Sequence, residues 1–401
     1  MNFIENNMEV ATAVQQSDQG EVLEAQVVAN FPPRPDAVVT LLHQDDFLPG
    51  VQTMLYSFRK KFSFHQTYPP EVVVLVTPNV DLEKATNILM PALCTRVMTV
   101  EEWWPPSQSI DSQLMKGFGK SNKRVLDNHN PGWTKLRIFG LQQYETILYI
   151  DSDCLVLKDV SHLLDLNKVY TESEALVAAA PDVLPPSNFN SGVMVIRPST
   201  QVFQTLQKNA EHLTTFDGSD TGYLNAYYPT WFTDFPPDAR LSAGYNAQTE
   251  LYERTKDPKT GESSFWDAQL SHDLHIIHYS EPIKPWQTES SDETNSLHTL
   301  WKSWYQKSKN FLLRDKKERA KQEKERLAKK QKLEQEAAAA REAAAKDPKR
   351  AHKLVTKRYK ELRAQGMSTH DAMQQARHEI LPNDSSQPDA GSQVAAMFGM
   401  Q

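Results

Sequence analysis

In the first half of the chain, short continuous runs of apolar residues alternate with longer segments in which apolar residues recur at every third or fourth position. The runs at 37–42, 71–77 and 146–150 are rich in valine, isoleucine and leucine, which is typical of buried strands. The segments at 47–62 and 82–93 have the spacing of amphipathic helices. Strands that alternate with helices predict an α/β fold, with a mostly parallel sheet covered by helices on both faces.

The same pattern divides the chain into five predicted parts. They are a polar, flexible segment at 1–35, an α/β domain at 36–305, a charged single helix or spacer at 306–346, a small helical segment at 347–383 and a disordered tail at 384–401. The charged segment has high helix propensity but no continuous apolar seam, so we expect an exposed helix rather than a regular coiled coil. The small helical segment predicts two short helices around Gly366, with Ser368 or Thr369 as the N-cap of the second.

The charges of the chain are unevenly placed. The 401 residues carry a net charge of −7, but residues 307–360 contain 20 basic and 8 acidic residues and carry +12, so the remainder carries −19. An acidic body with a basic arm is not the charge distribution of a nucleic-acid-binding enzyme.

The cysteines and the apolar runs indicate the compartment. Cys94 and Cys154 are too few for a disulfide framework or a zinc cluster. The N-terminus lacks the basic and apolar regions of a secretory signal, and no apolar run reaches the roughly 20 residues that cross a bilayer. The sequence therefore predicts a cytoplasmic protein without a membrane span.

Two carboxylates follow the apolar run at 146–150. Asp151 and Asp153 flank Ser152, so both side chains point the same way if the backbone is extended. Ligands of parallel α/β sheets bind at the carboxyl ends of strands, and two carboxylates there can hold a divalent cation such as Mn²⁺ or Mg²⁺. A solvated turn at a strand end explains the same three residues without a metal.

Several further motifs, in a fixed order, make the region from Ala37 to Trp286 resemble the family 8 glycosyltransferases, glycogenin-like proteins in particular. The motifs are VTLL at 39–42 with Asp45, Asp46 and Phe47 after it, VVVLVTP at 72–78, TKL at 134–136, YIDSDCLVL at 149–157, NSGVMV at 190–195, DGSDTGYLN at 217–225, YN at 245–246, and His278 followed by KPW at 284–286. The resemblance implies a GT-A fold for 36–305 and transfer of a hexose from a UDP-sugar with retention of anomeric configuration.

The resemblance also implies the residues of the site. Asp151, Asp153 and His278 are expected to bind the metal, with the imidazole favouring Mn²⁺ over Mg²⁺. Lys135, Asp217 and Asp220 are the expected catalytic residues. The expected donor-binding residues are Leu41, His43, Gln44, Phe47, Lys135, Asp151, Ser152, Asp153, Asn190, Ser191, Asp217, Asp220, Thr221, His278 and Lys284.

Each of these residues also has a simpler explanation that involves no ligand. A histidine after an apolar strand is often a hydrogen-bonded core residue, and a lone helical lysine such as Lys135 is often solvated. Asn190-Ser191-Gly192 also suits a plain turn. Either Lys123 or Arg124 is a further candidate for the diphosphate, and spacing does not decide between them.

The sequence departs from the family pattern at two places. Glu281 stands where the histidine-lysine motif of the family has a glycine, and its charge would repel a diphosphate unless the side chain points away. Tyr252 is the nearest candidate for a self-glucosylated tyrosine, but its offset is one residue short and a hydrophilic insertion follows it.

These observations leave three functions open. The first is a metal-dependent transferase that moves a hexose, glucose before others, from a UDP-sugar to a glycan or a protein tyrosine, as in glucan priming. The second is transfer of galactose to a small polyol such as inositol, and the third is a non-catalytic scaffold that binds UDP-sugar or glycan. The resemblance further implies a homodimer, since glycogenin-like proteins often form one.

Overall fold

The protein is described here from a computed structural model. It describes residues 9–16, 22–29, 35–63, 69–105, 109–110, 131–166, 177–183, 185–264, 266–270, 272–288 and 296–381. The chain divides between Leu313 and Arg314 into two compact units, which are considered separately. The helices of the described part include none that is both long and apolar enough to cross a membrane.

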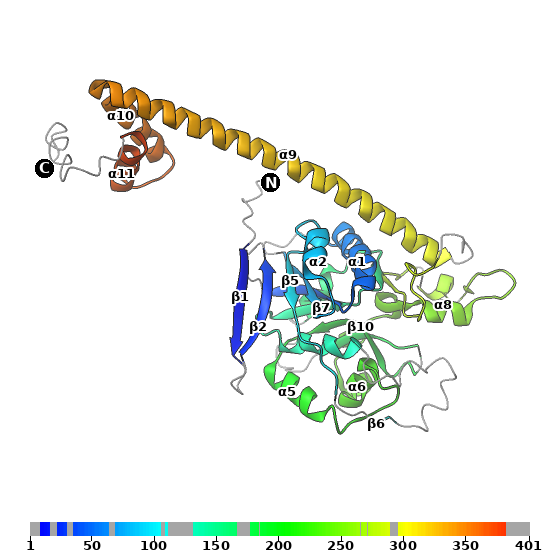
Figure 1. Ribbon diagram of the computed structural model, residues 1–401. Helices are drawn as coiled ribbons and strands as arrows, with labels where there is room; N and C mark the ends of the chain where they lie inside the picture. The colour runs from blue at the N-terminus through cyan, green and yellow to red at the C-terminus, as the bar shows by residue number, and fades with distance from the viewer. Residues whose placement is uncertain are drawn as a thin grey trace. The chain divides into compact units, whose positions relative to one another are not determined.

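An eight-stranded sheet forms the centre of the first unit (Figure 1). Its strands, in spatial order, are β1 (Glu9–Gln16), β2 (Val22–Ala29), β5 (Arg96–Thr99), β4 (Glu71–Val76), β3 (Asp36–Leu42), β7 (Thr146–Ile150), β10 (Phe189–Ile196) and β9 (Val177–Pro181). The four central strands, β5, β4, β3 and β7, are parallel, as the sequence predicts. The pairs at both edges are antiparallel, so the sheet as a whole is mixed.

Successive residues of the central strands pack on opposite faces of the sheet. Val38 and Leu42 of β3 face one core cluster, whereas Val39 and Leu41 face the other. The first cluster is covered by α1 (Leu48–Lys61) and α2 (Leu82–Leu89). The second is covered by the 3-10 helix η3 (Pro131–Gly140) with α5 (Thr200–Asn209) and α6 (Asp220–Tyr227), and Figure 1 shows the two groups of helices on opposite sides of the sheet.

Smaller elements complete the first unit. They are the strands β6 (Ser109–Ile110), β8 (Cys154–Val156), β11 (Thr214–Thr215), β12 (Ala247–Gln248) and β13 (Ile276–His278), the helices α7 (Trp231–Asp234) and α8 (Thr249–Thr255), the 3-10 turns η1 (Asp45–Phe47), η4 (Ser161–Asp165), η5 (Pro237–Ala239) and η6 (Ala243–Asn246), and the π-helical turn η7 (Trp266–Leu270). The strands β12, β13 and β8 form a second sheet beside the carboxyl end of β7.

The N-terminal segment differs from the prediction of a flexible lead-in. Strands β1 and β2 pair with each other, and β2 pairs with β5 through Val27 and Met98. Without β2, β5 would be an edge strand with unpaired backbone groups, and the hairpin satisfies them. The sequence 22–29 has the β-branched content of a strand, but its polar surroundings concealed it.

The long helix α9 (Ser296–Lys346) begins ten residues before the predicted domain boundary at 305. Its first turns belong to the first unit, where Trp301 is buried and Ser308 accepts a hydrogen bond from the Gln52 side chain over 2.8 Å. In the second unit, α10 (Pro348–Ala364) and α11 (Thr369–Ile380) pack through a small cluster of alanine, valine, leucine and isoleucine side chains. Ser368 caps α11, as one of the two predicted residues, and the tail at 384–401 lies outside the described residues.

Candidate active site

The predicted metal ligands come together between the end of β7 and the start of β8. Asp151 follows β7, and its backbone N–H donates to the Gly192 carbonyl at the start of β10 (2.8 Å). Asp153 precedes β8, which pairs antiparallel with β13 and so brings His278 alongside. His278 Nε2 lies 3.3 Å from Asp153 Oδ1 and 3.9 Å from Asp151 Oδ2.

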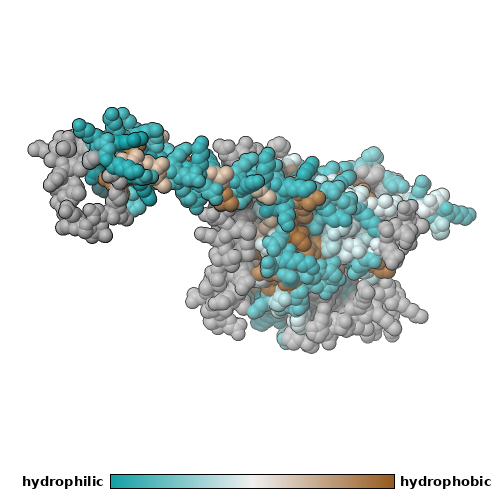
Figure 2. Space-filling view, turned by 45° about the horizontal axis from the view of Figure 1, so that its top comes forward, coloured by the Kyte–Doolittle hydropathy of each residue, from teal (hydrophilic) through white to brown (hydrophobic). Residues whose placement is uncertain are grey.

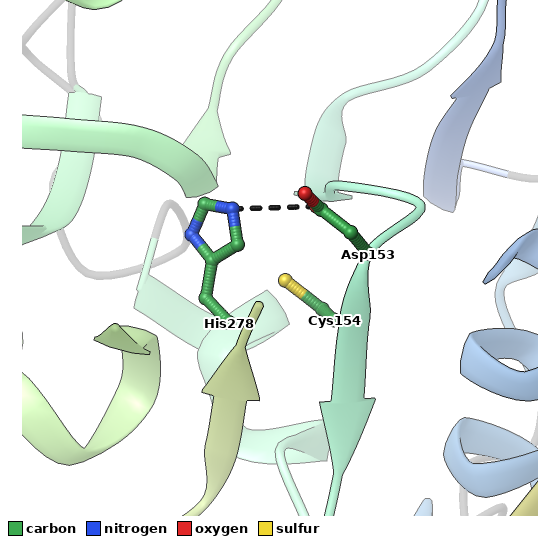
Figure 3. A group of neighbouring side chains, drawn as sticks. All are labelled: Asp153, Cys154 and His278. Carbon is green, nitrogen blue, oxygen red and sulfur yellow. Dashed lines mark ion pairs between the residues drawn. The ribbon is translucent and has the colours of Figure 1, made fainter. Parts of the chain in front are cut away.

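A thiol lies in the same cluster. Cys154 is paired with His278 across β8 and β13, and cross-strand partners share one face of a sheet. Its Sγ, a carboxylate oxygen of Asp153 and a ring nitrogen of His278 lie within 4.8 Å of one another (Figure 3). Burial raises the pKa of the Cys154 thiol well above its ordinary value, so it is a neutral neighbour rather than a thiolate.

Two lysines are buried against the carboxylates. Lys135 Nζ lies 3.0 Å from Asp151 Oδ2 and 3.0 Å from Asp220 Oδ2. Lys284 Nζ donates to Asp153 Oδ2 (2.7 Å) and to the Tyr279 carbonyl (2.8 Å). Lys135 and Lys284 are only 5% and 8% exposed, so neither is the solvated surface lysine of the simpler explanation.

The pKa shifts reflect this crowding. Burial raises the pKa of the Asp153 carboxyl, but Lys284 and His278 lower it by more, so it stays ionised. For Asp151 burial outweighs the effect of Lys135, and its pKa is raised. Burial lowers the pKa of Lys135, but Asp151 and Asp220 together raise it above its ordinary value.

The predicted donor-binding motif at 190–192 lies beside Lys135, whose Nζ is 3.4 Å from Ser191 Oγ. Ser191 Oγ donates to Asp220 Oδ2 (2.6 Å), so its 2.6 Å contact with the Thr221 hydroxyl must use the proton of Thr221. Gly192 is required here because a Cβ would lie 2.4 Å from Cε1 of His278. The motif is therefore not a plain turn, since it lies within β10 and contacts Asp220.

Asp217 lies apart from this ion-pair cluster. Its two oxygens accept hydrogen bonds from the Ser219 backbone (2.8 Å) and the Ser219 hydroxyl (2.6 Å) at the start of α6. A Cβ on Gly222 would approach Asp217 Oδ1 to 1.9 Å, so the glycine lets the carboxylate lie against the helix. Burial raises the pKa of Asp217 to about 6.

Four residues that the sequence prediction missed complete the site. Tyr149 donates to Asp151 Oδ1 over 2.6 Å, and Asn246 Oδ1 accepts from His278 Nδ1 over 2.8 Å. Gln248 and Asp182 join through a 2.9 Å hydrogen bond. The sequence contains a signal for two of the four. Asp182 follows a strand as Asp151 does, and Asn246 belongs to the YN motif itself.

The predicted donor-binding residues that follow β3 include an aromatic cluster. The ring of Phe47 lies 4.3 Å from that of His43 and 5.3 Å from that of Trp286, measured between ring centroids. Burial lowers the pKa of His43 to about 4, so it is a neutral ring at physiological pH. Gln44 is exposed at the start of η1. The side chain of Leu41 is buried in the core, so only its backbone could contact a UDP-sugar.

Within the described part of the chain, the remaining predicted residues make no contact that defines a role in the site. Ser152 is 6% exposed between the two aspartates. Tyr252 in α8 donates its hydroxyl to the Gly261 carbonyl (3.0 Å) and packs edge-on against Trp266. Glu281 is half-buried, and burial, followed by Glu253 and Glu250, raises its pKa. Lys123 and Arg124 lie outside the described residues.

The ligand atoms of Asp151, Asp153 and His278 fit a hard or borderline divalent cation. Two carboxylates and one imidazole nitrogen suit Mn²⁺, and their combined charge is offset within the site by the two lysines. If His278 is neutral, its Nε2 lone pair faces a carboxylate oxygen 3.3 Å away, a pair of acceptors that a bound cation would stabilise. The same three residues were predicted from the sequence, although Asp151 is also held by Lys135 and Tyr149.

The chain belongs to glycosyl transferase family 8, whose model matches residues 38–290. The parallel centre of the sheet and this membership confirm the expected fold class, a GT-A glycosyltransferase domain followed by a helical extension.

Among curated proteins, the chain is 28% identical over 281 residues to inositol phosphorylceramide glucuronosyltransferase 1 of Arabidopsis thaliana, which covers 62% of this chain and 42% of the relative. It is 28% identical over 283 residues to glycogenin-1 of Saccharomyces cerevisiae, strain YJM789, which covers 68% of this chain and 45% of the relative. The chain thus spans less than half the length of these two relatives.

Among solved structures, the chain resembles the glycosyltransferase GlyE of Streptococcus pneumoniae TIGR4, with a TM-score of 0.45 and 20% identity over 69% of this chain and 62% of that one. It also resembles the galactosyltransferase LgtC in complex with donor and acceptor sugar analogs. There the TM-score is 0.39 and the identity 13%, over 68% of this chain and 95% of that one.

Proposed function

We propose that this protein is a metal-dependent glycosyltransferase that moves a neutral hexose from a UDP-sugar to a hydroxyl acceptor. The observation that carries the proposal is the convergence of Asp151, Asp153 and His278 from separate strands, with Lys135 and Lys284 buried against the same carboxylates. A protein that had lost catalysis would have little reason to keep five charged or titratable groups buried together, because burying them costs folding free energy.

The three ligands would hold Mn²⁺ or Mg²⁺. When bound, the cation would supply positive charge that neutralises the charge developing on UDP as the sugar leaves. Every other contribution comes from side chains of the protein itself.

Lys284 is suited to meet the departing diphosphate. An ammonium group has three N–H donors, and two of those on Lys284 are used by Asp153 and the Tyr279 carbonyl. The third is available for a phosphate oxygen, and burial strengthens that interaction because water does not screen it. Glu281, three residues earlier, carries a charge that would oppose the diphosphate.

Lys135 has a different role. Its three donors face Asp151, Asp220 and Ser191, at 3.0, 3.0 and 3.4 Å. In this state it fixes two carboxylates, and it must release one of its three partners to contact a sugar hydroxyl. We therefore assign it the positioning of Asp220, which with Asp217 would orient the sugar ring.

The charges of the sugar-binding side favour a neutral hexose. Asp182, Asp217 and Asp220 lie on this side, and Lys135 is the one cation in the described residues that contacts any of them. A uronic acid donor would bring a fourth carboxylate against them. We therefore propose glucose as the transferred sugar, with galactose next, although one relative is named a glucuronosyltransferase.

The acceptor is proposed to be external. The hydroxyl of Tyr252, the nearest candidate for self-glucosylation, is engaged within its own loop by Gly261. A saccharide or polyol hydroxyl can approach without rearranging that loop, which favours it over the tyrosine. We propose transfer with retention of configuration, as the resemblance to the family implies, and we assign no carboxylate as a nucleophile.

The test combines intact mass with release of UDP. Purified protein with Mn²⁺ is incubated with UDP-glucose, UDP-galactose or UDP-glucuronate, first alone and then with a maltooligosaccharide or inositol. We expect UDP release that needs an acceptor, prefers UDP-glucose and is absent in Asp153→Ala. A ladder of hexose masses on the protein alone would contradict the external acceptor, and a preference for UDP-glucuronate would contradict the neutral hexose.

A further inference from the structure

We infer that Asn246 is a positioning residue for His278, and that a relay of side-chain amides fixes the tautomer in which His278 offers Nε2 to the metal. The inference rests on the proposed function, since it concerns one ligand of the proposed cation. It adds a residue that contacts the ring of His278 on the side away from the carboxylates, and it is read from the directions of six hydrogen bonds.

The relay begins at a backbone N–H, a group that can act only as a hydrogen-bond donor. The backbone N–H of Gly192 can only donate, and it donates to Asn190 Oδ1 over 2.9 Å. The Nδ2 of Asn190 must therefore point the other way, where Asp182 Oδ1 and Gln248 Oε1 accept from it at 3.4 Å. Gln248 Nε2 in turn donates to Asp182 Oδ1 over 2.9 Å. This bond leaves Gln248 Oε1 to accept from Asn190, so the amide orientations of Asn190 and Gln248 agree.

The direction then passes to Asn246. Because Asn190 Oδ1 is an acceptor, the atom of Asn246 that lies 2.9 Å from it must be Nδ2, the donor. The other end of the same amide is Oδ1, which can only accept. It lies 2.8 Å from His278 Nδ1, so this ring nitrogen must carry the proton.

The consequence lies on the opposite side of the ring. A neutral imidazole protonated at Nδ1 has its lone pair on Nε2. Nε2 is the atom that faces Asp153 and Asp151 (3.3 and 3.9 Å), where the proposed cation would lie. Asn246 and His278 are 2% and 6% exposed, so water does not offer the ring an alternative partner.

The neighbouring backbone also limits how the ring can move. A Cβ on Gly192 would lie 2.4 Å from Cε1 of His278, so β10 is in close contact with one edge of the imidazole. The same glycine thus supplies the N–H that starts the relay and the space that the ring occupies. This double use explains why the orientation of His278 depends on residues from β10 and η6 as well as on its own strand.

The experiment compares Asn246→Leu, Asn246→Asp and His278→Ala with the unchanged protein in two measurements. The first is the affinity for Mn²⁺ in the presence of UDP, from the free Mn²⁺ signal in electron paramagnetic resonance. The second is the tautomer of His278 in ¹⁵N-histidine-labelled protein with Mg²⁺ and UDP, with its signals identified by their loss in His278→Ala.

We expect Asn246→Leu to weaken Mn²⁺ binding by about 10- to 100-fold and to shift the neutral imidazole toward the Nε2–H form. Asn246→Asp keeps an acceptor for Nδ1–H, so it should retain the Nδ1–H tautomer. It should lose less affinity than Asn246→Leu, even though its second oxygen would face Asn190 Oδ1. Gln52→Leu is the matched control, because it removes another buried amide, one that bonds Ser308 far along the chain, and it should change neither measurement.

The outcomes separate this inference from the proposed function. If the unchanged protein fails to bind Mn²⁺, or His278→Ala binds it equally well, the proposed metal site is wrong. If that site is sound but Asn246→Leu keeps both affinity and tautomer, or the unchanged protein has Nε2–H, the relay is wrong. Circular dichroism of each variant shows whether a loss of affinity comes from unfolding instead.

Discussion

The candidate active site and the helix α9 beyond Arg314 both contain many ion pairs, but the pairs differ in surroundings. In the active site, Lys135 and Lys284 hold aspartates with side chains that are 20% exposed or less. Along α9, pairs such as Arg326–Glu323 and Lys332–Glu336 join side chains that are more than half exposed. Figure 2 shows the second unit as largely hydrophilic on the face it displays.

This difference decides what each set of pairs can do. In water an ion pair of the surface type contributes about 0.2–1 kcal/mol, because solvent screens the charges and the side chains lose freedom. A buried pair does not stabilise the fold more than apolar residues would, but losing one partner leaves an unpaired charge. The buried pairs are thus explained by chemistry, and the exposed pairs by helix formation and solubility.

The largest expected effect comes from removing a charge on the metal side. Asp153→Ala should lower kcat/KM on the order of a thousandfold, because the variant loses a metal ligand and the partner of Lys284. Release of UDP under steady-state conditions measures the change. Glu323→Ala removes the same charge from α9 and should leave kcat/KM unchanged, so an equal loss in both variants would contradict the comparison.

Removing a buried cation should affect stability next. Lys135→Met leaves Asp151 and Asp220 without their ammonium partner, and we expect a loss of about 3 kcal/mol in the free energy of unfolding. Urea denaturation followed by tryptophan fluorescence measures it. Lys332→Met, in an exposed pair, is the control, and a loss below 1 kcal/mol for Lys135→Met would mean that the buried cluster is solvated.

The buried carboxyl of Asp217 should make the free energy of unfolding depend on pH. Burial raises the pKa of Asp217 from an ordinary value of 3.8 to about 6, so the folded state binds its proton more tightly than the unfolded state. Asp217 therefore favours the folded state most below pH 4, and this contribution falls by about 2–3 kcal/mol as the pH rises to 6 and above.

Asp217→Asn tests this assignment. The amide cannot ionise and still accepts from the Ser219 backbone, so the variant should lack this fall and be more stable than the unchanged protein at pH 8. Urea denaturation from pH 4 to pH 8 gives the two curves. Parallel curves would show that Asp217 does not titrate in this range.

The smallest effect is expected on α9. Arg326→Gln breaks the pair with Glu323 and should change the free energy of unfolding by no more than about 0.5 kcal/mol, with no change in transferase activity. Thermal unfolding in 50 mM and 500 mM salt measures it, and the difference between the variant and the unchanged protein should shrink at high salt. A loss above 2 kcal/mol would show that α9 is not simply solvated.

Much of the fold could be predicted from the sequence because its signals are local. The runs of valine, isoleucine and leucine predicted β3, β4 and β7, and the capping residues predicted the start of α11. The hairpin of β1 and β2 was missed because its pairing with β5 depends on a strand some 70 residues away. The early start of α9 was missed for a related reason, since the buried Trp301 reads locally as the end of a domain.

The sequence by itself determined which residue types stand at the strand ends, and the family motifs named Asp151, Asp153, His278 and Lys284. Only the tertiary structure decided how these groups are paired and which direction each hydrogen bond takes. The antiparallel pairing of β8 with β13 brings His278 to Asp153 across 125 residues, and η6 brings Asn246 to its ring. Side-chain direction and tautomer depend on contacts between distant segments, and no local pattern encodes those contacts.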